Sequence, residues 1–317
     1  MSDVAIAVER LVKTYRRAGR PELRAVDDLS FTVRRGAIFG LLGPNGAGKT
    51  TTLRVLTTLA RPTSGHAEVL GHDVVAQPLE VRRRIGVVIQ EQAAELLLSV
   101  RDNLTTFARF HRRTGAAIRR RAADVMARFG LDALADTKVQ DLSGGVRRRV
   151  QVAKMFMVDL PVVFLDEFST GMDAILKREV MALLRAEAAQ GRTIVLTTQI
   201  LTEAEELCDD ILIVDRGRQI ARGDLHALKM LAERVYEVAL GFERVPEELP
   251  ALLAGYATSD VVVEPHSVRF RVCEDERRVL ELVAALAGRG GLLRVEIGGA
   301  SLEDVFIELT RRAGGRS

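Results

Sequence analysis

Short apolar segments alternate with segments of helical pattern up to about residue 225. The apolar segments are rich in β-branched residues, as buried strands are, and they cover 37–42, 85–89, 162–165, 194–198 and 211–214. Apolar positions recur at helical spacing over 50–59, 146–158, 174–190 and 203–208. Alternation of this kind predicts a largely parallel sheet covered by helices. Two early segments, 4–8 and 29–33, indicate an additional antiparallel layer.

Residues 99–140 break this alternation, because they are rich in Arg and Ala and carry no strand signal. They predict a helical insertion. After a boundary expected within 223–233, the pattern becomes β-α-β-β-α-β, the order of the split βαβ or ferredoxin-like motif, and a last helix follows at 301–311. We therefore expect two domains, 1–225 and 226–317, with a helical subdomain at about 91–142 in the first.

Composition and charge narrow the classes of protein. The 317 residues are 47% hydrophobic and 28% charged, which suits a folded core and argues against wholesale disorder. A net charge of +3 is too weak to indicate a nucleic-acid partner, and the arginine runs 82–84, 119–121 and 147–149 are interpreted as solvated helix faces. Cys208 and Cys273 cannot form a disulfide framework or a zinc site, which favours a reducing compartment.

The chain shows no signal peptide and no apolar run near the roughly 18 residues that span a bilayer. We therefore expect a cytoplasmic protein, which could still sit on a membrane through a partner.

The clearest chemical signal is a phosphate-binding loop between an apolar strand and a helix. Its residues in chain order are Gly43, Pro44, Asn45, Gly46, Ala47, Gly48, Lys49 and Thr50. Glycines let main-chain N–H groups turn inward around a polyphosphate, and the start of the helix points its positive end at the same anion. We expect Lys49 to reach the β- and γ-phosphates of a bound nucleotide and the Thr50 hydroxyl to bind Mg²⁺, with Thr51 also at the nucleotide.

A second chemical signal is a pair of acids at the end of another apolar strand. The strand at 162–165 leads into Asp166 and Glu167, at the mouth of the sheet where open α/β sheets bind ligands. Asp166 would hold Mg²⁺ directly or through water. Glu167 would polarise the attacking water as a general base. Together with the phosphate-binding loop, the two acids predict a nucleoside triphosphatase.

A third motif lies between these two, with the residues Leu142, Ser143, Gly144, Gly145, Val146, Arg147, Arg148 and Arg149. At this point the chain resembles the ATP-binding cassette (ABC) ATPases, the motor subunits of ABC transporters, and this motif is similar to the signature motif of that family. Ser143 and the N–H groups of Gly144 and Gly145 at a helix start can hold a γ-phosphate. The resemblance implies that they hold the ATP of the opposite subunit. It also implies an α/β P-loop NTPase core with a mostly parallel sheet, an antiparallel β layer and a helical subdomain, followed by a small α+β C-terminal domain.

The resemblance covers about residues 4–225 and implies further roles. Tyr15 matches the aromatic residue that stacks on adenine, while a Tyr packed in the core is the alternative. Gln90 matches the Q-loop glutamine, which contacts Mg²⁺ or the attacking water. Residues 169–173 match the D-loop, which crosses the dimer interface. The tail at 301–310 is similar to the end of ATPases that serve ABC-2-type exporters, including the daunorubicin-resistance group and sodium-extruding relatives.

Four residues depart from the family pattern. Val146 replaces a Gln or Met, and Phe168 and Ala174 each replace a Pro. Gln199 stands where most members have the switch His that contacts the γ-phosphate. Gln keeps a hydrogen-bond donor but cannot carry charge. The daunorubicin-resistance-like branch also tends to show Gln here, so the expected catalytic set is Glu167, Gln199, Gln90 and Lys49.

The resemblance implies ATP and Mg²⁺ as cofactors and a dimer that closes around two ATP molecules. It also implies a separate ABC-2-type permease that would hold the protein at the inner face of the cell membrane. The segment 91–98 could receive the cytoplasmic helix of that permease, or it could pack inward as an ordinary amphipathic helix. The cargo is not specified, and multidrug efflux is one possibility among lipid, ion and polysaccharide export.

Three other interpretations stay open. The departures allow a low-activity half of a heterodimeric ABC pair. The arginine runs alone support a nucleic-acid- or ribosome-associated ABC ATPase, although we expect no nucleic-acid partner. Gln199 and Val146 also allow a regulatory module that binds ATP without hydrolysing it.

Overall fold

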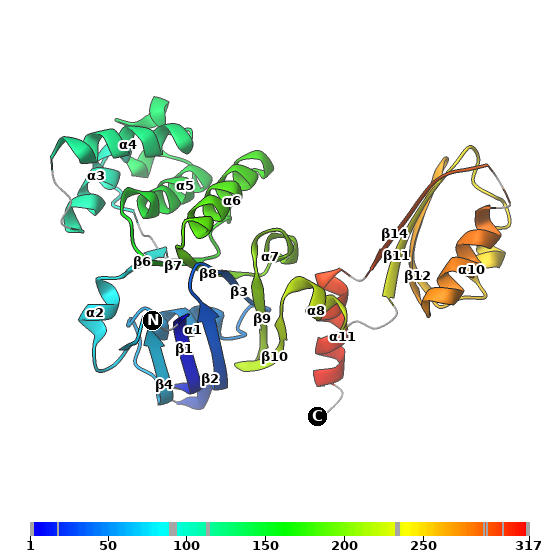
Figure 1. Ribbon diagram of the computed structural model, residues 1–317, viewed down its shortest axis with the longest axis horizontal. Helices are drawn as coiled ribbons and strands as arrows, with labels where there is room; N and C mark the ends of the chain where they lie inside the picture. The colour runs from blue at the N-terminus through cyan, green and yellow to red at the C-terminus, as the bar shows by residue number, and fades with distance from the viewer. Residues whose placement is uncertain are drawn as a thin grey trace. The chain divides into compact units, whose positions relative to one another are not determined.

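The computed structural model describes residues 3–17, 19–88, 94–111, 115–231, 235–287, 289, 291–299 and 301–314. The chain folds into two compact units, Met1–Arg222 and Gly223–Ser317 (Figure 1). The first unit carries all three of the sequence motifs. The second begins at Gly223, the last residue of strand β10 (Arg218–Gly223), at the start of the range 223–233 in which we expected the boundary and three residues before the domain start at 226.

A six-stranded sheet forms the centre of the first unit, in the order β10-β9-β3-β8-β7-β6. Its strands are β3 (Ile38–Leu42), β6 (Ile85–Val88), β7 (Val162–Asp166), β8 (Thr193–Thr198), β9 (Asp210–Asp215) and β10 (Arg218–Gly223). The pairs β3·β8, β3·β9, β6·β7 and β7·β8 are parallel, which confirms the predicted fold class. Every residue of β3, β7 and β8 is buried, as their continuous apolar sequences require.

The register of the parallel strands brings three strand ends to one edge. Thr197 lies beside Asp166 across β7·β8, and Thr198 lies beside Leu42 across β3·β8. The phosphate-binding loop follows β3 directly and leads into α1 (Lys49–Leu56). Because carboxyl ends of parallel strands share an edge, this loop, the two acids after β7 and the end of β8 become neighbours.

An antiparallel sheet forms the second layer of this unit, in the order β2-β1-β4-β5. Its strands are β1 (Val4–Arg17), β2 (Arg20–Arg34), β4 (Ser64–Val69) and β5 (His72–Asp73). The apolar faces of both sheets and of α1 share one buried core, in which the rings of Phe31 and Phe39 stack at 5.3 Å. The predicted strands 4–8 and 29–33 are parts of two longer strands.

The remaining helices of the first unit lie between its strands. They are α2 (Pro78–Arg82), α3 (Val100–Phe110), α4 (Ala116–Arg128), α5 (Gly144–Lys154), α6 (Ala174–Ala189) and α7 (Leu201–Leu207), with 3₁₀ turns at Asp132–Leu134, Val139–Asp141 and Met155–Met157. Helices α3 and α4 form the predicted helical insertion. Ser143 is the N-cap of α5, since its Oγ accepts from the N–H of Val146 at 3.4 Å. Figure 1 shows α3, α4 and α5 gathered beyond one end of the central sheet.

The second unit is a four-stranded antiparallel sheet packed on helix α10 (Glu276–Ala287). The strands are β11 (Val235–Phe242), β12 (Thr258–Glu264), β13 (Ser267–Cys273) and β14 (Leu292–Gly299), and the short helix α9 (Leu249–Leu253) lies between β11 and β12. The sheet order is β12-β13-β11-β14. This is the connectivity of a split βαβ motif. Two further helices, α8 (Leu225–Lys229) and α11 (Leu302–Gly314), flank it in sequence. Ser301 and Asp304 cap α11 reciprocally, because the N–H of each residue donates to the side-chain oxygen of the other.

No helix among the described residues is both long enough and apolar enough to cross a bilayer.

Candidate functional site: a phosphate-binding pocket at the sheet edge

The phosphate-binding loop can turn tightly because glycine occupies its strained positions. Gly48 has φ +102°, and a Cβ there would lie 2.3 Å from the carbonyl oxygen of Ala25. Gly46 has φ +82°, with no other atom within 4 Å of an added Cβ. A side chain is therefore excluded at Gly48 by contact and disfavoured at both positions by backbone conformation. The main-chain N–H groups of the loop lie at the start of α1, which is the arrangement that binds anions.

Lys49 is held inside this loop. Its side chain is only 5% exposed, and Nζ donates to the carbonyl oxygens of Gly43 at 2.7 Å and Pro44 at 3.0 Å. Burial lowers the pKa of Lys49, and the charges of Glu167 and Asp166 oppose that change. The ammonium group thus lies between the loop and the two acids, where it can meet a polyphosphate.

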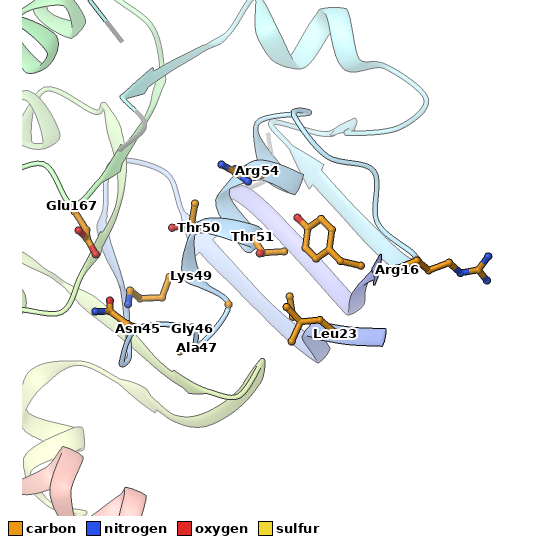
Figure 2. Close-up of a pocket in the computed structure, with 13 residues that line it drawn as sticks. Arg16, Leu23, Asn45, Gly46, Ala47, Lys49, Thr50, Thr51, Arg54 and Glu167 are labelled. Carbon is orange, nitrogen blue, oxygen red and sulfur yellow. The ribbon is translucent and has the colours of Figure 1, made fainter. Parts of the chain in front are cut away.

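A pocket of about 530 Å³ opens over the loop (Figure 2). Its lining is Tyr15, Arg16, Leu23, Ala25, Asn45, Gly46, Ala47, Gly48, Lys49, Thr50, Thr51, Arg54 and Glu167. Tyr15 and Leu23 lie opposite each other across β1·β2, and Lys13 Nζ lies 4.9 Å from the centre of the Tyr15 ring. One end of the pocket therefore offers an aromatic and an aliphatic side chain, and the other offers Lys49 and Glu167.

The side-chain oxygen atoms of Asp166 and Thr50 lie close together beside the pocket, where they could act as metal ligands. Asp166 is 1% exposed, and Thr50 Oγ1 lies 3.3 Å and 3.2 Å from its two carboxylate oxygens. The hydroxyl of Thr197 donates to Asp166 Oδ1 and fixes the carboxylate from the neighbouring strand. A hydroxyl and a carboxylate are hard oxygen ligands of the kind that Mg²⁺ prefers, so these residues fit that ion.

Glu167 turns toward the pocket because its backbone leaves the strand conformation. It has φ +49°, which is uncommon for a residue other than glycine. Its N–H donates to Thr197 O at 3.0 Å, and the buried guanidinium of Arg148 donates from Nη2 to the carbonyl oxygens of Asp166 and Glu167, the latter at 3.0 Å. Contacts from β8 and α5 therefore hold the strained turn that presents Glu167.

Arg148 corrects the interpretation of the run 147–149 as a solvated face. Arg148 is 7% exposed, and burial lowers its pKa while the charges of Asp166 and Glu167 oppose that change. Arg147 donates to the carbonyl oxygens of Leu142 and Gln140, and Arg149 donates to those of Phe129 and Gly130. All three side chains thus satisfy main-chain acceptors within their own unit.

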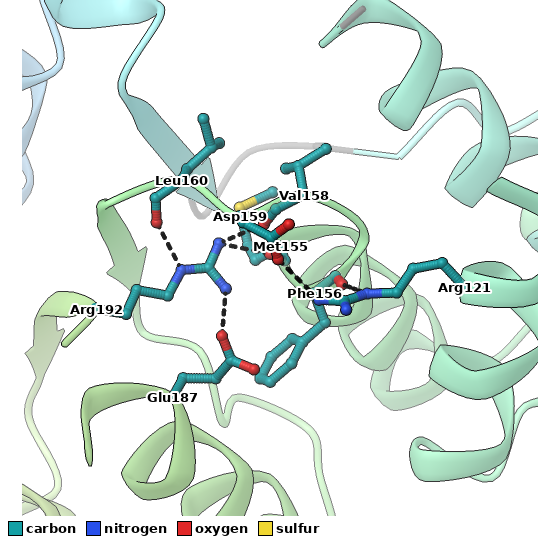
Figure 3. Close-up of polar contacts among 8 residues, drawn as sticks. All are labelled: Arg121, Met155, Phe156, Val158, Asp159, Leu160, Glu187 and Arg192. Atoms are coloured by element: carbon teal, nitrogen blue, oxygen red, sulfur yellow. Dashed lines mark hydrogen bonds and ion pairs between the residues drawn. The ribbon is translucent and has the colours of Figure 1, made fainter. Parts of the chain in front are cut away.

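Other arginines hold the segment between α5 and β7 in the same way (Figure 3). Arg192, which directly follows the turn after α6, donates to the carbonyl oxygens of Leu160, Met155 and Val158 and pairs with Glu187 at 2.9 Å. Arg121 of α4 donates to Phe156 O and pairs with Asp159 at 3.2 Å. These contacts hold the segment that joins β7 to α5, the helix that begins in the signature motif. We call α5 the signature helix.

The signature residues lie apart from the pocket formed by their own chain. Ser143 and Gly144 are exposed at the tip of α5, and among the described residues Ser143, Gly144 and Gly145 do not line the pocket. Gly145 touches the loop 169–173, because a Cβ there would lie 2.0 Å from the carbonyl oxygen of Gly171. Gln199 is exposed directly after β8. Gln90 lies outside the described residues.

Two of the four departures from the family pattern have a local structural account, and nothing in the structure explains Val146. Phe168 is fully buried and belongs to the core. Ala174 begins α6, whose N-cap is Asp173, with a side chain that accepts from Leu176 N at 2.9 Å. Because this cap already orders the first turn, a Pro at the first helical position is not needed. Val146 is half-buried in the first turn of α5.

The segment after Gln90 has both inward and outward side chains in its described part. Ala94 is buried and Leu97 is 74% exposed, while Leu96 and Leu98 are half-buried. Main-chain bonds from Gln140 and Val139 to the carbonyl oxygens of Leu96 and Leu98 hold it against the chain before α5.

This geometry defines a nucleotide-binding P-loop fold, and comparison with known proteins identifies the family. The model of the ABC transporter family matches residues 26–170. The daunorubicin/doxorubicin resistance ATP-binding protein DrrA of Streptomyces peucetius is 38% identical over 312 residues, which cover 96% of this chain and 92% of that protein. The Nod factor export ATP-binding protein I of Ralstonia nicotianae is 37% identical over 315 residues, covering 98% and 95%.

Solved structures agree with this result. The structure of an ATP-binding subunit of an ABC transporter matches with a TM-score of 0.65 and 26% identity, covering 71% of this chain and 92% of that one. A dimeric structure of the bacterial ABC transporter cassette MJ0796 matches with a TM-score of 0.65 and 25% identity, covering 69% and 98%. The chain therefore belongs to the ATP-binding proteins of ABC transporters, a family of ATPases, which confirms the resemblance seen in the sequence.

Proposed function

We propose that this chain is the ATP-hydrolysing motor of an ABC exporter, and that it works as a dimer with a separate membrane permease of the ABC-2 type. One observation carries the proposal: Lys49, the Thr50–Asp166 pair and Glu167 converge on one edge of the sheet, at a pocket of about 530 Å³. The names of the relatives, which include drug resistance and Nod factor export proteins, support an exporter.

The pocket suits ATP from end to end. The phosphate chain would lie in the loop from Gly43 to Thr51, with Lys49 at the β- and γ-phosphates. The adenine would stack on Tyr15, with Leu23 beside it in the opposite strand. The positive end of α1 would favour the same anion.

The two acids would divide the chemistry. Thr50 and Asp166 would hold Mg²⁺, with Gln90 as a further ligand, and the ion would neutralise charge that develops on the phosphates. Glu167 would orient the attacking water and accept its proton. Gln199 would donate a hydrogen bond to the γ-phosphate from the end of β8.

A dimer would complete each site. Ser143, Gly144 and Gly145 lie apart from the pocket of their own chain, and the first two are exposed, so they are available to the γ-phosphate bound by a second chain. ATP would then stabilise the closed dimer, because it binds that state best. Hydrolysis removes the group that both chains hold, and the dimer loosens. The permease would convert this cycle into transport at the inner face of the membrane, with the outward-facing Leu97 as one contact.

The contacts of the arginines weaken the nucleic-acid interpretation, whereas Gln199 favours the heterodimer interpretation. The arginine run 147–149 is one of the three runs that support the nucleic-acid interpretation, and its side chains donate to main-chain acceptors of their own unit. The uncharged Gln199 favours a second candidate, the low-activity half of a heterodimeric pair. A robust turnover by the isolated chain would exclude that candidate.

Glu167→Gln in the full chain tests the proposal. We expect ATP turnover to fall by about 10²–10⁴-fold, the usual contribution of a general base, while the Kd for ATP changes less than twofold. Lys49→Ala should instead weaken ATP binding. Glu179→Gln, at an exposed position of α6, is the matched control. Unchanged turnover in Glu167→Gln would refute Glu167 as the base.

A further inference from the structure

Glu203 is a buried carboxylate that the mechanism above does not use. It lies in the first turn of α7 and is 1% exposed. Acidic residues are almost never this buried unless they are paired, so its partners indicate what it does.

Three side chains meet the carboxylate of Glu203, each from a different element. The Ser169 hydroxyl donates to Oε1 at 2.5 Å, and the Thr198 hydroxyl donates to Oε2 at 2.9 Å. Lys177 Nζ of α6 lies 3.4 Å from Oε1. Both carboxylate oxygens therefore accept, and one cation balances the charge.

The two hydroxyl partners belong to two segments next to the proposed catalytic residues, the loop 169–173 and the end of β8. Ser169 begins the loop 169–173, which follows the acids and touches Gly145 of the signature. Thr198 is the last residue of β8 and directly precedes Gln199. Thr198 Oγ1 also accepts from the N–H of Ile200 at 2.9 Å, so it orders the backbone on both sides of Gln199.

We propose that Glu203 is a positioning residue that couples the loop 169–173 to Gln199. A shift of this loop pulls on Ser169 and, through one carboxylate, on the strand end that carries Gln199. The inference rests on the proposed function, because it assumes that Gln199 faces the γ-phosphate and that the loop meets the second chain. Glu203 touches neither nucleotide nor Mg²⁺ in this role.

A carboxylate suits this role better than an amide does. Ser169 and Thr198 each point a hydroxyl donor at a separate oxygen of Glu203. Glutamine has a single oxygen, so its NH₂ group would face either Thr198 or, in the other amide orientation, Ser169 and Lys177. One of the two hydroxyls would then have to rotate and accept from the NH₂ group, and both segments would lose their charge-assisted hydrogen bonds. The link between them would be weakened without a change in side-chain volume.

Glu203→Gln in the full chain is the first test, with Glu206→Gln on an exposed position of the same helix as the matched control. We expect kcat for ATP hydrolysis to fall at least tenfold in Glu203→Gln, with the Kd for ATP unchanged within twofold, and neither to change in Glu206→Gln. A merely structural role would weaken ATP binding and lower Tm together with kcat, and that result would overturn the inference, as would an unchanged kcat.

A double-mutant cycle with Ser169→Ala supplies the second test. If Glu203 acts through Ser169, the double variant should lose no more activity than Glu203→Gln alone, whereas additive losses would overturn the coupling. If Glu203→Gln does not fold, Thr198→Val with Ser169→Ala gives the same cycle with smaller changes. An inactive wild-type chain that still binds ATP, alone and with its permease, would refute the proposed function. An active wild type with an unaffected Glu203→Gln would refute only this inference.

Discussion

A Cβ on Gly145 would lie 2.0 Å from the carbonyl oxygen of Gly171, so the signature helix and the loop after the catalytic acids meet backbone to backbone. The contact requires glycine at 145, and Gly171 itself has φ +78°. Two segments that are proposed to face a second chain are thus packed on each other within one chain.

Gly145→Ala should therefore destabilise the protein, whereas Gly144→Ala should not. An added methyl group at 145 meets main-chain atoms, which cannot rotate away, and overpacking of this kind costs about 1–3 kcal/mol. At 144, no atom lies within 4 Å of an added Cβ. Thermal unfolding measured by circular dichroism should show Tm lowered by a few degrees for Gly145→Ala only. Equal Tm values for the two variants would contradict this contact.

Thr50→Val should raise the Mg²⁺ concentration needed for half-maximal ATPase activity by at least about tenfold. The change removes the hydroxyl that lies 3.2 Å from Asp166, and it keeps the shape of the side chain. Turnover measured against Mg²⁺ concentration at saturating ATP checks this. Thr57→Val, at the other end of the same helix and outside the pocket, should leave the Mg²⁺ dependence unchanged. An unaltered dependence in Thr50→Val would remove Thr50 from the proposed metal site.

Arg148→Met should reduce both kcat and stability, because it leaves the carbonyl oxygens of Asp166 and Glu167 without their buried donor. A buried acceptor left unsatisfied costs about 1–3 kcal/mol. This cost applies to the carbonyl oxygen of Asp166, since that of Glu167 still accepts from the N–H of Thr170 at 3.3 Å, and the turn that presents Glu167 loses one of its supports. Arg149→Met removes bonds to Phe129 and Gly130 instead, so it should lower Tm and leave kcat within about threefold. Steady-state kinetics and thermal unfolding of both variants distinguish the two roles. Similar kcat values would show that Arg148 has no special part in the turn.

His66 should make a small, pH-dependent contribution to stability. Its Nε2 lies 2.9 Å from Glu68 and its Nδ1 lies 3.0 Å from Asp73, and the hydrogen bond with Glu68 is the main reason that its pKa is raised. A raised pKa means that the folded state holds the proton more tightly, so the stabilisation is complete below the ordinary histidine pKa of about 6.5 and disappears as pH rises through the raised value.

Because the ring is partly exposed, the effect should be that of a surface ion pair, about 0.2–1 kcal/mol. Urea unfolding of wild type and His66→Gln should differ most near pH 5.5 and converge above pH 8 or so. A difference that grows with rising pH would reverse the assigned direction.

The motifs were readable from the sequence because each one depends on a short, local set of residues. The loop from Gly43 to Thr50 and the acids Asp166 and Glu167 adjoin continuous apolar strands, and both lie where the alternation of strands and helices predicts. The positioning residues were not readable in this way. Arg148 sits in a run of three arginines that looks solvated, and Glu203 is one of three glutamates in a short helix. Their burial depends on which elements pack against them.

The sequence by itself determined the class of fold, the phosphate-binding loop, the two acids and the family, because local backbone requirements and a period of apolar residues suffice for each. Only the tertiary structure decided that Thr197 fixes Asp166, that Arg148 holds the turn at Glu167, and that Glu203 joins Ser169 to Thr198. These contacts join residues far apart in the chain. Strand register and helix packing bring them within hydrogen-bonding distance, and no local pattern encodes that distance.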